Sequence, residues 1–223
     1  MLSRTYRQAT VHPQQEAYNL TDASNTHWWR AERRRLDAEA LRDTMLAVSG
    51  DLDDSRGGPS FKSSIAANAV EGLSTKDAAW KASPAQQQLR RSLYMYSQRT
   101  LLLPMMTTFN FTDTVSPCGQ RDSTIAPTQA LALLNNVFSH ERSTALARRV
   151  MDTGDATPDA RVARAWQFAL GRNPSADESR LSLAHLADQQ ARFVEAGEAS
   201  AAQRALESLC HVLLNGNEFI YVD

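Results

Sequence analysis

Apolar residues recur at helical spacing in one stretch near the start of the chain. In residues 34–48 the apolar positions lie three or four residues apart, which predicts a helix with one buried side. These positions are Ala38, Leu41, Met45 and Val48. Gly50 follows them, and glycine commonly adopts the left-handed conformation that ends a helix. We therefore expect one helix over this stretch.

The same spacing continues through most of the chain after residue 126. It predicts helices over residues 127–138, through 145–150, over 158–170, over about 176–193 and over about 201–214. The apolar stripe of the first of these helices consists of Ala130, Leu131, Leu134, Val137 and Phe138. Pro127 and Pro158 suit a first helical turn, and Ser175 with Glu178 forms a capping box. The C-terminal half is therefore predicted to be a helical bundle.

Two stretches lack the helical spacing. Residues 53–88 contain few large apolar residues and many Ser, Ala and Gly, which predicts a surface loop or a partly disordered excursion anchored by Trp80. Residues 93–96 are adjacent β-forming residues and favour a short extended segment. The predicted fold class is mainly α: a helical bundle with one or two short extended segments and a long loop. We expect residues 1–223 to form a single domain.

The composition is that of an ordinary globular domain and argues against two classes of partner. Apolar residues make up 42% of the 223 residues, charged residues make up 22%, and the formal net charge is −1. A nucleic-acid-binding protein is normally more basic, so we expect no nucleic-acid partner. The apolar stretch of residues 101–111 is well short of the roughly 20 residues that span a bilayer. We expect no membrane span, and the first residues do not form a secretory signal.

The residue types that usually carry catalysis or bind metals occur without the spacing such sites require. The five histidines form no HxxxH or HExxH pattern, and the chain has no GxSxG, Walker or GxGxxG motif and no CxxCH for attaching a haem. We therefore expect neither a metal nor a cofactor in this chain. Cys118 and Cys210 are too far apart in the sequence to form a CxxC pair. They are either buried free thiols or the two ends of a long-range disulfide.

A dense group of charged residues lies at the start of the first predicted helix. Arg35, Glu39 and Arg42 follow one another at spacings of four and three residues, so a helix would place them in one ion-paired row. Arginines from later in the chain would join this row if the fold brought them near. The candidate polar cluster consists of Arg35, Asp37, Glu39, Arg42, Asp43, Arg91 and Arg121.

This cluster allows two main interpretations. Closed ion pairs would make it a scaffold that joins helices. Arginines left without acidic partners would instead form a pocket for a carboxylate or a sulfate. Glu39 and Asp43 are one helical turn apart, as catalytic carboxylates can be, but the neighbouring arginines favour two ionised carboxylates. Contact with nucleic acid is a weaker third interpretation, because the charges nearly cancel over residues 32–43.

Six separated segments together resemble a known family. In chain order they are RRRLDAEALRDTMLAVSGDLD, RRSLYMY, SPCGQR, STIAPTQALALLNN, ALGRNPSADE and LCHVLLNGNEFIYVD. They resemble the C-terminal planctomycete domain of unknown function that is called the PSD domain. Proteins with that domain are large, and they often also carry a cytochrome c domain of planctomycete type.

The resemblance indicates the kind of protein to which this chain belongs, but the family has no established activity to carry over. It implies that this chain is the C-terminal part of a larger extracytoplasmic protein and that any haem belongs to a separate upstream domain. Such a location favours a disulfide between Cys118 and Cys210 more strongly than the residues alone do. We expect a non-catalytic interaction or scaffold domain that contacts its upstream domains and a protein partner or polysaccharide. The alternative is a carbohydrate-binding or hydrolytic accessory domain that uses the polar cluster.

Overall fold

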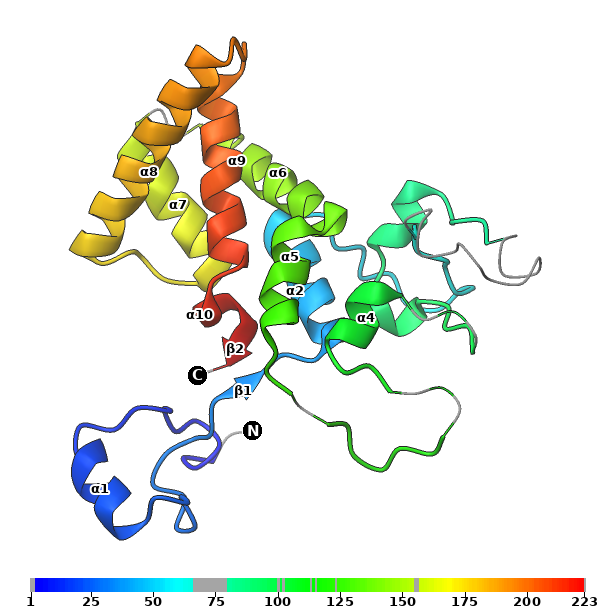
Figure 1. Cartoon of the computed structure of the whole chain (residues 1–223), viewed down its shortest axis with the longest axis vertical. Helices are drawn as coiled ribbons and strands as arrows, with labels where there is room; N and C mark the ends of the chain where they lie inside the picture. The colour runs from blue at the N-terminus through cyan, green and yellow to red at the C-terminus, as the bar shows by residue number, and fades with distance from the viewer. Residues whose placement is uncertain are drawn as a thin grey trace.

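The chain forms a mainly α structure, as predicted (Figure 1). It is a computed structural model that describes residues 3–65, 80–99, 101, 103–112, 114, 116–122, 124–154 and 157–222. The α-helices are α1 (Gln15–Thr21), α2 (Ala38–Ser49), α4 (Pro104–Thr108), α5 (Pro127–Asn135), α6 (Val137–Met151), α7 (Pro158–Leu170), α8 (Ala176–Glu195), α9 (Ala201–Leu214) and α10 (Asn217–Ile220). The 3₁₀ turns are η2 (Ala85–Leu89) and η3 (Ser92–Tyr94), and the short strands are β1 (Arg34–Arg35) and β2 (Tyr221–Val222). Within these described ranges, no helix combines the length and the apolarity needed to cross a membrane.

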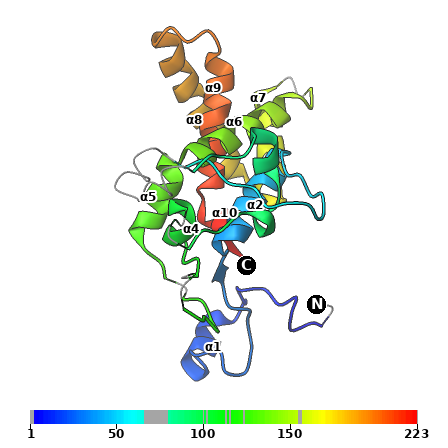
Figure 2. The ribbon, with the colours of Figure 1, turned by 90° about the vertical axis from the view of Figure 1, so that its right-hand side faces the viewer.

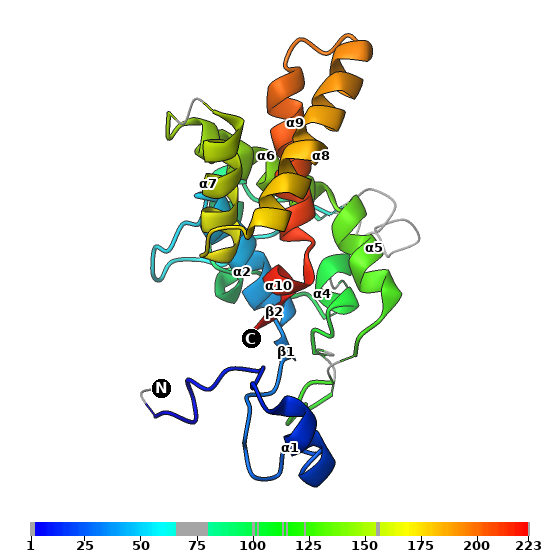
Figure 3. The same cartoon turned by 90° about the vertical axis from the view of Figure 1, so that its left-hand side faces the viewer.

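Helices α2 and α6 to α9 surround the hydrophobic core. Helix α9 lies between α8 and α6, and α2 packs against α6 and α7 (Figures 1 and 3). Leu41 and Met45 of α2 meet Leu146 and Val150 of α6 in the same buried cluster. The apolar buried side of α9 consists of Ala201, Ala205, Leu206, Leu209, Cys210, Leu213 and Leu214. Burying each large apolar side chain contributes roughly 2 kcal/mol, so this cluster is the main source of stability.

The first predicted helix begins later than its apolar spacing indicated. Residues 34 and 35 form β1, which pairs antiparallel with β2 near the C-terminal end. The backbone N–H of Leu36 also donates to the carbonyl of Ile220 at 2.8 Å. Helix α2 therefore starts only at Ala38. Its predicted end is confirmed, because Gly50 follows it with a left-handed φ of +83°.

The predicted loop of residues 53–88 is irregular over most of its described length and ends in the turn η2. Residues 66–79 of this loop lie outside the described residues. Trp80 anchors the loop as predicted, since its ring centre lies 6.1 Å from that of Tyr96 outside the loop, and its indole N–H donates to the carbonyl of Ser63 within the loop at 2.8 Å. A second anchor is Phe61, which is only 1% exposed. The sequence did not indicate it, because a single phenylalanine has no apolar periodicity around it.

The extended segment predicted over residues 93–96 is reduced to its last two residues. Its first half belongs to the 3₁₀ turn η3. The backbone N–H of Phe61 donates to the carbonyl of Tyr94 at 3.0 Å, and the N–H of Tyr96 donates to the carbonyl of Phe61 at 2.7 Å. An isolated β-bridge between Phe61 and Met95 therefore forms in place of the expected strand.

Helix α5 buries the opposite side from its predicted apolar stripe. Its buried residues are Gln129 and Leu133, whereas Leu131 and Leu134 are 60% and 47% exposed. The amide of Gln129 donates to two carbonyls of the preceding segment at 3.0 Å each, which fixes this side of the helix inward. The predicted helix of residues 127–138 also divides at Asn136, whose side-chain oxygen caps the start of α6. The polar anchor therefore decided the orientation of α5.

The N-terminal segment that carries α1 lies apart from the bundle (Figures 2 and 3). No residue of α1 is buried. The segment is held locally by Asp22, whose carboxylate accepts the backbone N–H groups of His27 at 2.8 Å and Thr26 at 2.9 Å. These hydrogen bonds lower the pKa of Asp22 to about 2. Trp29 packs on Tyr18 with ring centres 5.4 Å apart, so aromatic contacts within the segment replace contacts with the core.

Arg172 joins the turn between α7 and α8 to α10. Its guanidinium donates two hydrogen bonds of 2.8 Å to Glu178 and two of 2.6 Å to Glu218. The same group lies 4.8 Å from the ring centre of Trp166. The predicted capping box between Ser175 and Glu178 is confirmed. Hydrogen bonds from Arg172 and from the backbone of Ser175 lower the pKa of Glu178 to about 2. Glu218 therefore pairs with Arg172 and does not pair with the arginines of the polar cluster.

Candidate functional site

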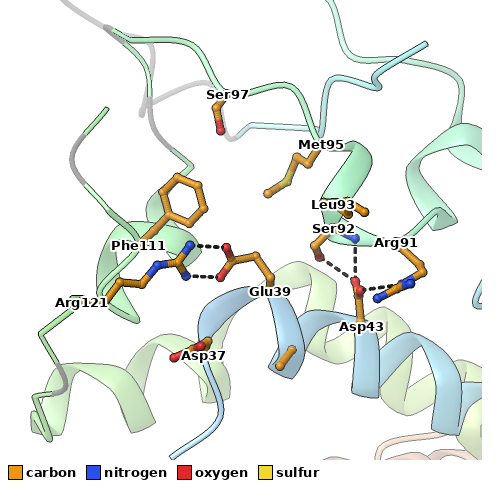
Figure 4. A pocket seen from close by; sticks show the side chains of 11 residues that line it. Asp37, Glu39, Asp43, Arg91, Ser92, Leu93, Met95, Ser97, Phe111 and Arg121 are labelled. Atoms are coloured by element: carbon orange, nitrogen blue, oxygen red, sulfur yellow. Dashed lines mark hydrogen bonds and ion pairs between the residues drawn. The ribbon is translucent and has the colours of Figure 1, made fainter. Parts of the chain in front are cut away.

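The polar cluster lies around an open hollow of about 510 Å³ on the N-terminal half of α2 (Figure 4). Helix α2 forms the floor, residues 91–97 form one wall, and Phe111 with Arg121 forms the other. Five of the seven predicted residues line the hollow: Asp37, Glu39, Asp43, Arg91 and Arg121. The fold therefore brings together residues from three separate parts of the chain.

The predicted ion-paired row along one helix is wrong. Arg35 lies in β1, before α2 begins, so it is not one helical turn from Glu39. Its Nη2 atom instead donates to Oδ1 of Asn110 at 2.9 Å and to the carbonyl of Phe109 at 3.4 Å. The guanidinium also lies 5.1 Å from the ring centre of Phe109. Arg35 thereby attaches β1 to the end of α4.

Glu39 pairs with Arg121, which lies 82 positions later in the chain. Both carboxylate oxygens of Glu39 accept hydrogen bonds of 2.8 Å from the guanidinium, in the bidentate geometry that favours strong pairing. Burial acts to raise the pKa of Glu39, but the contacts with Arg121 and the backbone outweigh it and the pKa is lowered. The pKa of Arg121 is raised, chiefly by its hydrogen bonds to Glu39. This pair holds the wall that contains Phe111 against α2.

Asp43 fixes the opposite wall of the hollow. The backbone N–H and the hydroxyl of Ser92 both donate to Oδ1 of Asp43 at 2.7 Å. Arg91 and Arg42 each place one guanidinium nitrogen 3.6 Å from the same carboxylate. Asp43 thus accepts the backbone N–H group at the start of the turn η3. It also forms ion pairs with Arg42 and Arg91.

Arg42 is buried beneath the hollow and does not line it. It is 5% exposed and lies between the rings of Phe61 and Phe138, at 5.2 and 5.3 Å from their centres. Its guanidinium donates to the carbonyl of Arg90 at 3.0 Å, to the hydroxyl of Ser92 at 3.1 Å, and to the carbonyl of Gln88. Burial lowers the pKa of Arg42 to about 10, so the group stays charged at neutral pH.

Two charged groups of the cluster face solvent from the hollow. Over the part of the chain that the structure describes, the carboxylate of Asp37 has no hydrogen bond or ion pair. The side chain of Arg91 is 54% exposed, and its contact with Asp43 is an ion pair without a hydrogen bond. The remaining walls are apolar and come from Leu93, Met95 and Phe111. The charged groups of the hollow that a ligand could contact are therefore the carboxylate of Asp37 and the guanidinium of Arg91. The surface around them is apolar.

The geometry does not suit Glu39 and Asp43 to acid–base catalysis. A carboxyl group that acts as a general acid needs a pKa raised toward neutrality. The pKa of Glu39 is lowered, and the carboxylate of Asp43 is already engaged by Ser92 and Arg91. Among the described residues, no group of three or more His, Cys, Asp or Glu side chains is placed to hold a metal ion.

The disulfide between Cys118 and Cys210 is not formed, and both thiols are free. Cys210 lies fully buried on α9, where burial raises the pKa of its thiol. Cys118 is exposed, and its Sγ donates to the carbonyl of Gln120 at 3.1 Å. The expectation of a buried free thiol is confirmed for Cys210 and wrong for Cys118. One residue belongs to the core and the other to an outer loop, and the sequence separation alone did not distinguish these environments.

Two further residues organise the site and were not part of the predicted polar cluster. Oδ1 of Asn110 accepts from Arg35 and also from the hydroxyl of Thr124 at 3.1 Å. Arg90 is 7% exposed, and it donates to the carbonyls of Pro59 and Gly57. Asn110 has a φ of +61°, and asparagine tolerates this left-handed conformation better than most residues.

Arg42→Lys should lower the free energy of unfolding by about 2–4 kcal/mol, because lysine keeps the charge but cannot reach all three acceptors. Urea denaturation measures this loss. Arg34→Lys makes the same change at an exposed arginine of β1 and should stay within about 0.5 kcal/mol of the wild type. Equal losses in the two variants would mean that the buried hydrogen bonds of Arg42 do not hold the loop.

Glu39→Gln and Arg121→Gln should show a coupling energy of about 1 kcal/mol in a double-mutant cycle at neutral pH, because the pair is bidentate but partly exposed. The pKa of Glu39 is lowered on folding. The coupling should therefore be present above the ordinary glutamate pKa of about 4.3 and fade as the pH falls through the folded value. Unfolding curves of the four proteins at several pH values measure it. Additive effects at neutral pH would contradict the pairing.

Comparisons with known proteins give one match. The sequence model of the family PSD1, described as "Protein of unknown function (DUF1553)", matches residues 1–186. No curated protein and no solved structure matches the chain. Five of the six segments that resemble the PSD domain lie inside the matched range, and the last lies beyond it. The resemblance is confirmed, and the chain belongs to the PSD1 family of unknown function.

Proposed function

We propose that this chain is a non-catalytic interaction or scaffold domain whose charged cluster joins segments of its own fold. The observation that carries the proposal is that Glu39, Arg42 and Asp43 all have partners within the chain. These partners come from loops that carry little regular structure of their own. A cluster whose charges pair with one another fixes how the loops pack against α2. Few of its charged groups are then left to act on a substrate.

We propose the outer side of α5 as the surface that meets other domains. Residues 124–139 contain no Asp, Glu, Lys or Arg, in a chain where 22% of residues are charged. Ile125 is 77% exposed, Leu131 60% and Val137 71%. A run of exposed apolar residues on a soluble domain commonly marks a contact with another protein surface. Its occupant in this proposal is the upstream part of the same protein.

The proposed setting rests on the family resemblance. We propose that residues 1–223 are one domain at the C-terminal end of a larger extracytoplasmic planctomycete protein. Any haem would then belong to a separate upstream cytochrome c domain, since this chain has no CxxCH motif. A protein partner or a polysaccharide is the proposed external ligand of the whole protein.

Amide hydrogen exchange of the isolated chain and of the full-length protein tests the interaction surface. The amides of α5 should exchange more slowly in the full-length protein, because a covered helix opens less often. Helix α8 also exposes apolar residues, singly, and should exchange at the same rate in both proteins. Leu131→Ser combined with Leu134→Ser should abolish the difference at α5. Equal exchange of α5 in the two wild-type proteins would contradict the proposal.

A carbohydrate-binding or hydrolytic accessory role is the second candidate. The observation in its favour is that Asp37 and Arg91 line the hollow at opposite ends, with the apolar side chain of Phe111 on the wall beside Arg121 (Figure 4). A sugar carries several hydroxyl groups, and each can donate and accept hydrogen bonds, so different hydroxyls could meet the carboxylate and the guanidinium.

A binding screen of the chain against neutral and sulfated glycans separates the two candidates. We expect no saturable binding at the hollow if the cluster is a scaffold. Binding that is lost in a folded Arg91→Ala variant and kept in Arg34→Ala would support the second candidate and contradict the first. Because both arginines are exposed, neither change should unfold the chain.

A further inference from the structure

Two neighbouring tryptophans of the N-terminal segment have opposite surroundings. Trp29 belongs to the local packing, since its ring centre lies 5.4 Å from that of Tyr18 and its indole N–H donates to the carbonyl of Asp22 at 3.0 Å. Trp28 is 68% exposed. Over the part of the chain that the structure describes, no ring stacks on the indole of Trp28 and no acceptor meets its N–H. Because burial is what makes a tryptophan stabilise a fold, packing does not explain why one occupies this position.

The backbone at Trp28 has a conformation that a bulky residue rarely adopts. Its φ is +56°, which lies in the left-handed region. Asn25 has a similar φ of +54°, but asparagine tolerates this region better. Bulky residues in the left-handed region are strained, and they persist where the surrounding structure fixes them, often at binding sites. The strain at Trp28 is therefore a second sign that this residue serves something other than packing.

Hydrogen bonds on both sides of Trp28 hold it in this conformation. Asn25 is only 6% exposed, and its side chain donates to the carbonyl of Arg30 at 2.9 Å and accepts the N–H of Arg30 at 3.2 Å. The N–H of Trp28 donates to the carbonyl of Asn25 at 3.1 Å. The carboxylate of Asp22 accepts two more backbone N–H groups of the loop. Residues 22–30 therefore form a closed loop that fixes the position of Trp28 on the segment lying apart from the bundle (Figures 2 and 3).

The residues that precede Trp28 in this loop are small or polar. Residues 22–27 are Asp, Ala, Ser, Asn, Thr and His. The side chain of His27 is 85% exposed, and its Nδ1 atom lies 3.2 Å from the carboxylate of Asp22. The hydroxyls of Ser24 and Thr26 are also exposed, 3.0 Å from each other. The loop therefore combines one exposed indole with several groups that can donate or accept hydrogen bonds.

This combination fits the ring of a neutral sugar. A pyranose has a flat face of C–H groups that can stack on an indole, and a rim of hydroxyls that need donors and acceptors. The centre of a protein interface usually gathers several apolar side chains, whereas this loop offers one. A nucleic acid or a sulfated glycan requires cations, but residues 22–28 contain one carboxylate and no Lys or Arg. The chemistry of the loop therefore favours a neutral glycan.

We propose that Trp28 is a stacking platform for a neutral polysaccharide, displayed by the loop of residues 22–30. The loop fixes the indole before the ligand arrives, so little conformational entropy is lost on binding. The platform is separate from the hollow on α2 and uses none of the polar cluster. It therefore goes beyond the function proposed above, and a scaffold role of the cluster neither requires nor excludes it.

Titrations of the whole chain with neutral hexasaccharides of glucose, xylose, mannose and galactose test the proposal, with NMR of the indole N–H groups as the readout. At least one of these sugars should bind saturably and shift the signal of Trp28. Trp28→Gly should weaken that binding about tenfold or more, the effect of losing one stacking contact. Trp28→Tyr keeps an aromatic ring and should retain most of the binding.

Trp28→Gly also separates a binding role from a structural one. Glycine adopts a left-handed φ without strain, so the amide of Arg30 should exchange with solvent no faster than in the wild type. Trp29→Gly removes the packing on Tyr18 and should speed the exchange of the same amide. Equally fast exchange in the two variants would mean that Trp28 holds the loop together, and the proposal would be overturned.

Leu20→Ser is the matched control for binding, because Leu20 is 89% exposed on α1 of the same segment. It should leave the affinity for the sugar unchanged. Equal losses in Leu20→Ser and Trp28→Gly would indicate a broader apolar surface of the kind that binds proteins, which overturns the proposal. It is also overturned if none of the sugars binds, or if binding survives in Trp28→Gly. Binding that survives there but is lost in Arg91→Ala would place the ligand in the hollow.

Discussion

Arg42 imposes the constraint on which the arrangement of the irregular segments depends. A guanidinium that is 5% exposed has to be surrounded by hydrogen-bond acceptors, since an unpaired buried charge is strongly destabilising. The carbonyls of α2 are used within the helix, and the carboxylate of its Asp43 lies 3.6 Å from Arg42, which is too far for a hydrogen bond. The carbonyls of Gln88 and Arg90 must therefore lie against α2, and the loop that carries them is fixed there. Arg90 then binds the carbonyls of Pro59 and Gly57, which fixes the next part of the loop.

Two other members of the polar cluster also find their partners in distant segments. Arg35 takes its acceptor from Asn110, and Glu39 takes its donor from Arg121. Each contact joins α2 or the strand before it to a different distant segment. The cluster is therefore distributed over the fold, in contrast to a row of neighbours along one helix. That distribution explains why a surface rich in charge leaves only a shallow and partly apolar hollow.

Several local features could be predicted because their causes lie within a few residues. Gly50 ends α2, and Ser175 with Glu178 starts α8, because backbone conformation and capping act over one helical turn. The helices around the core follow from apolar spacing for the same reason. The prediction failed for α5, where Leu131 and Leu134 face solvent. Its apolar residues occupy more than one side, so periodicity alone could not choose the buried one.

The sequence by itself determined the mainly α class and the approximate helices of the bundle, and it indicated five of the charged residues that line one hollow. Only the tertiary structure decided which charges pair. Spacings of three and four residues offered local ion pairs worth about 0.2–0.5 kcal/mol each, too little to compete with buried or bidentate contacts. Pairing of β1 with β2 then moved Arg35 off the helix altogether. Partners such as Arg121 lie far along the chain, and only packing of the core brings them within hydrogen-bond distance.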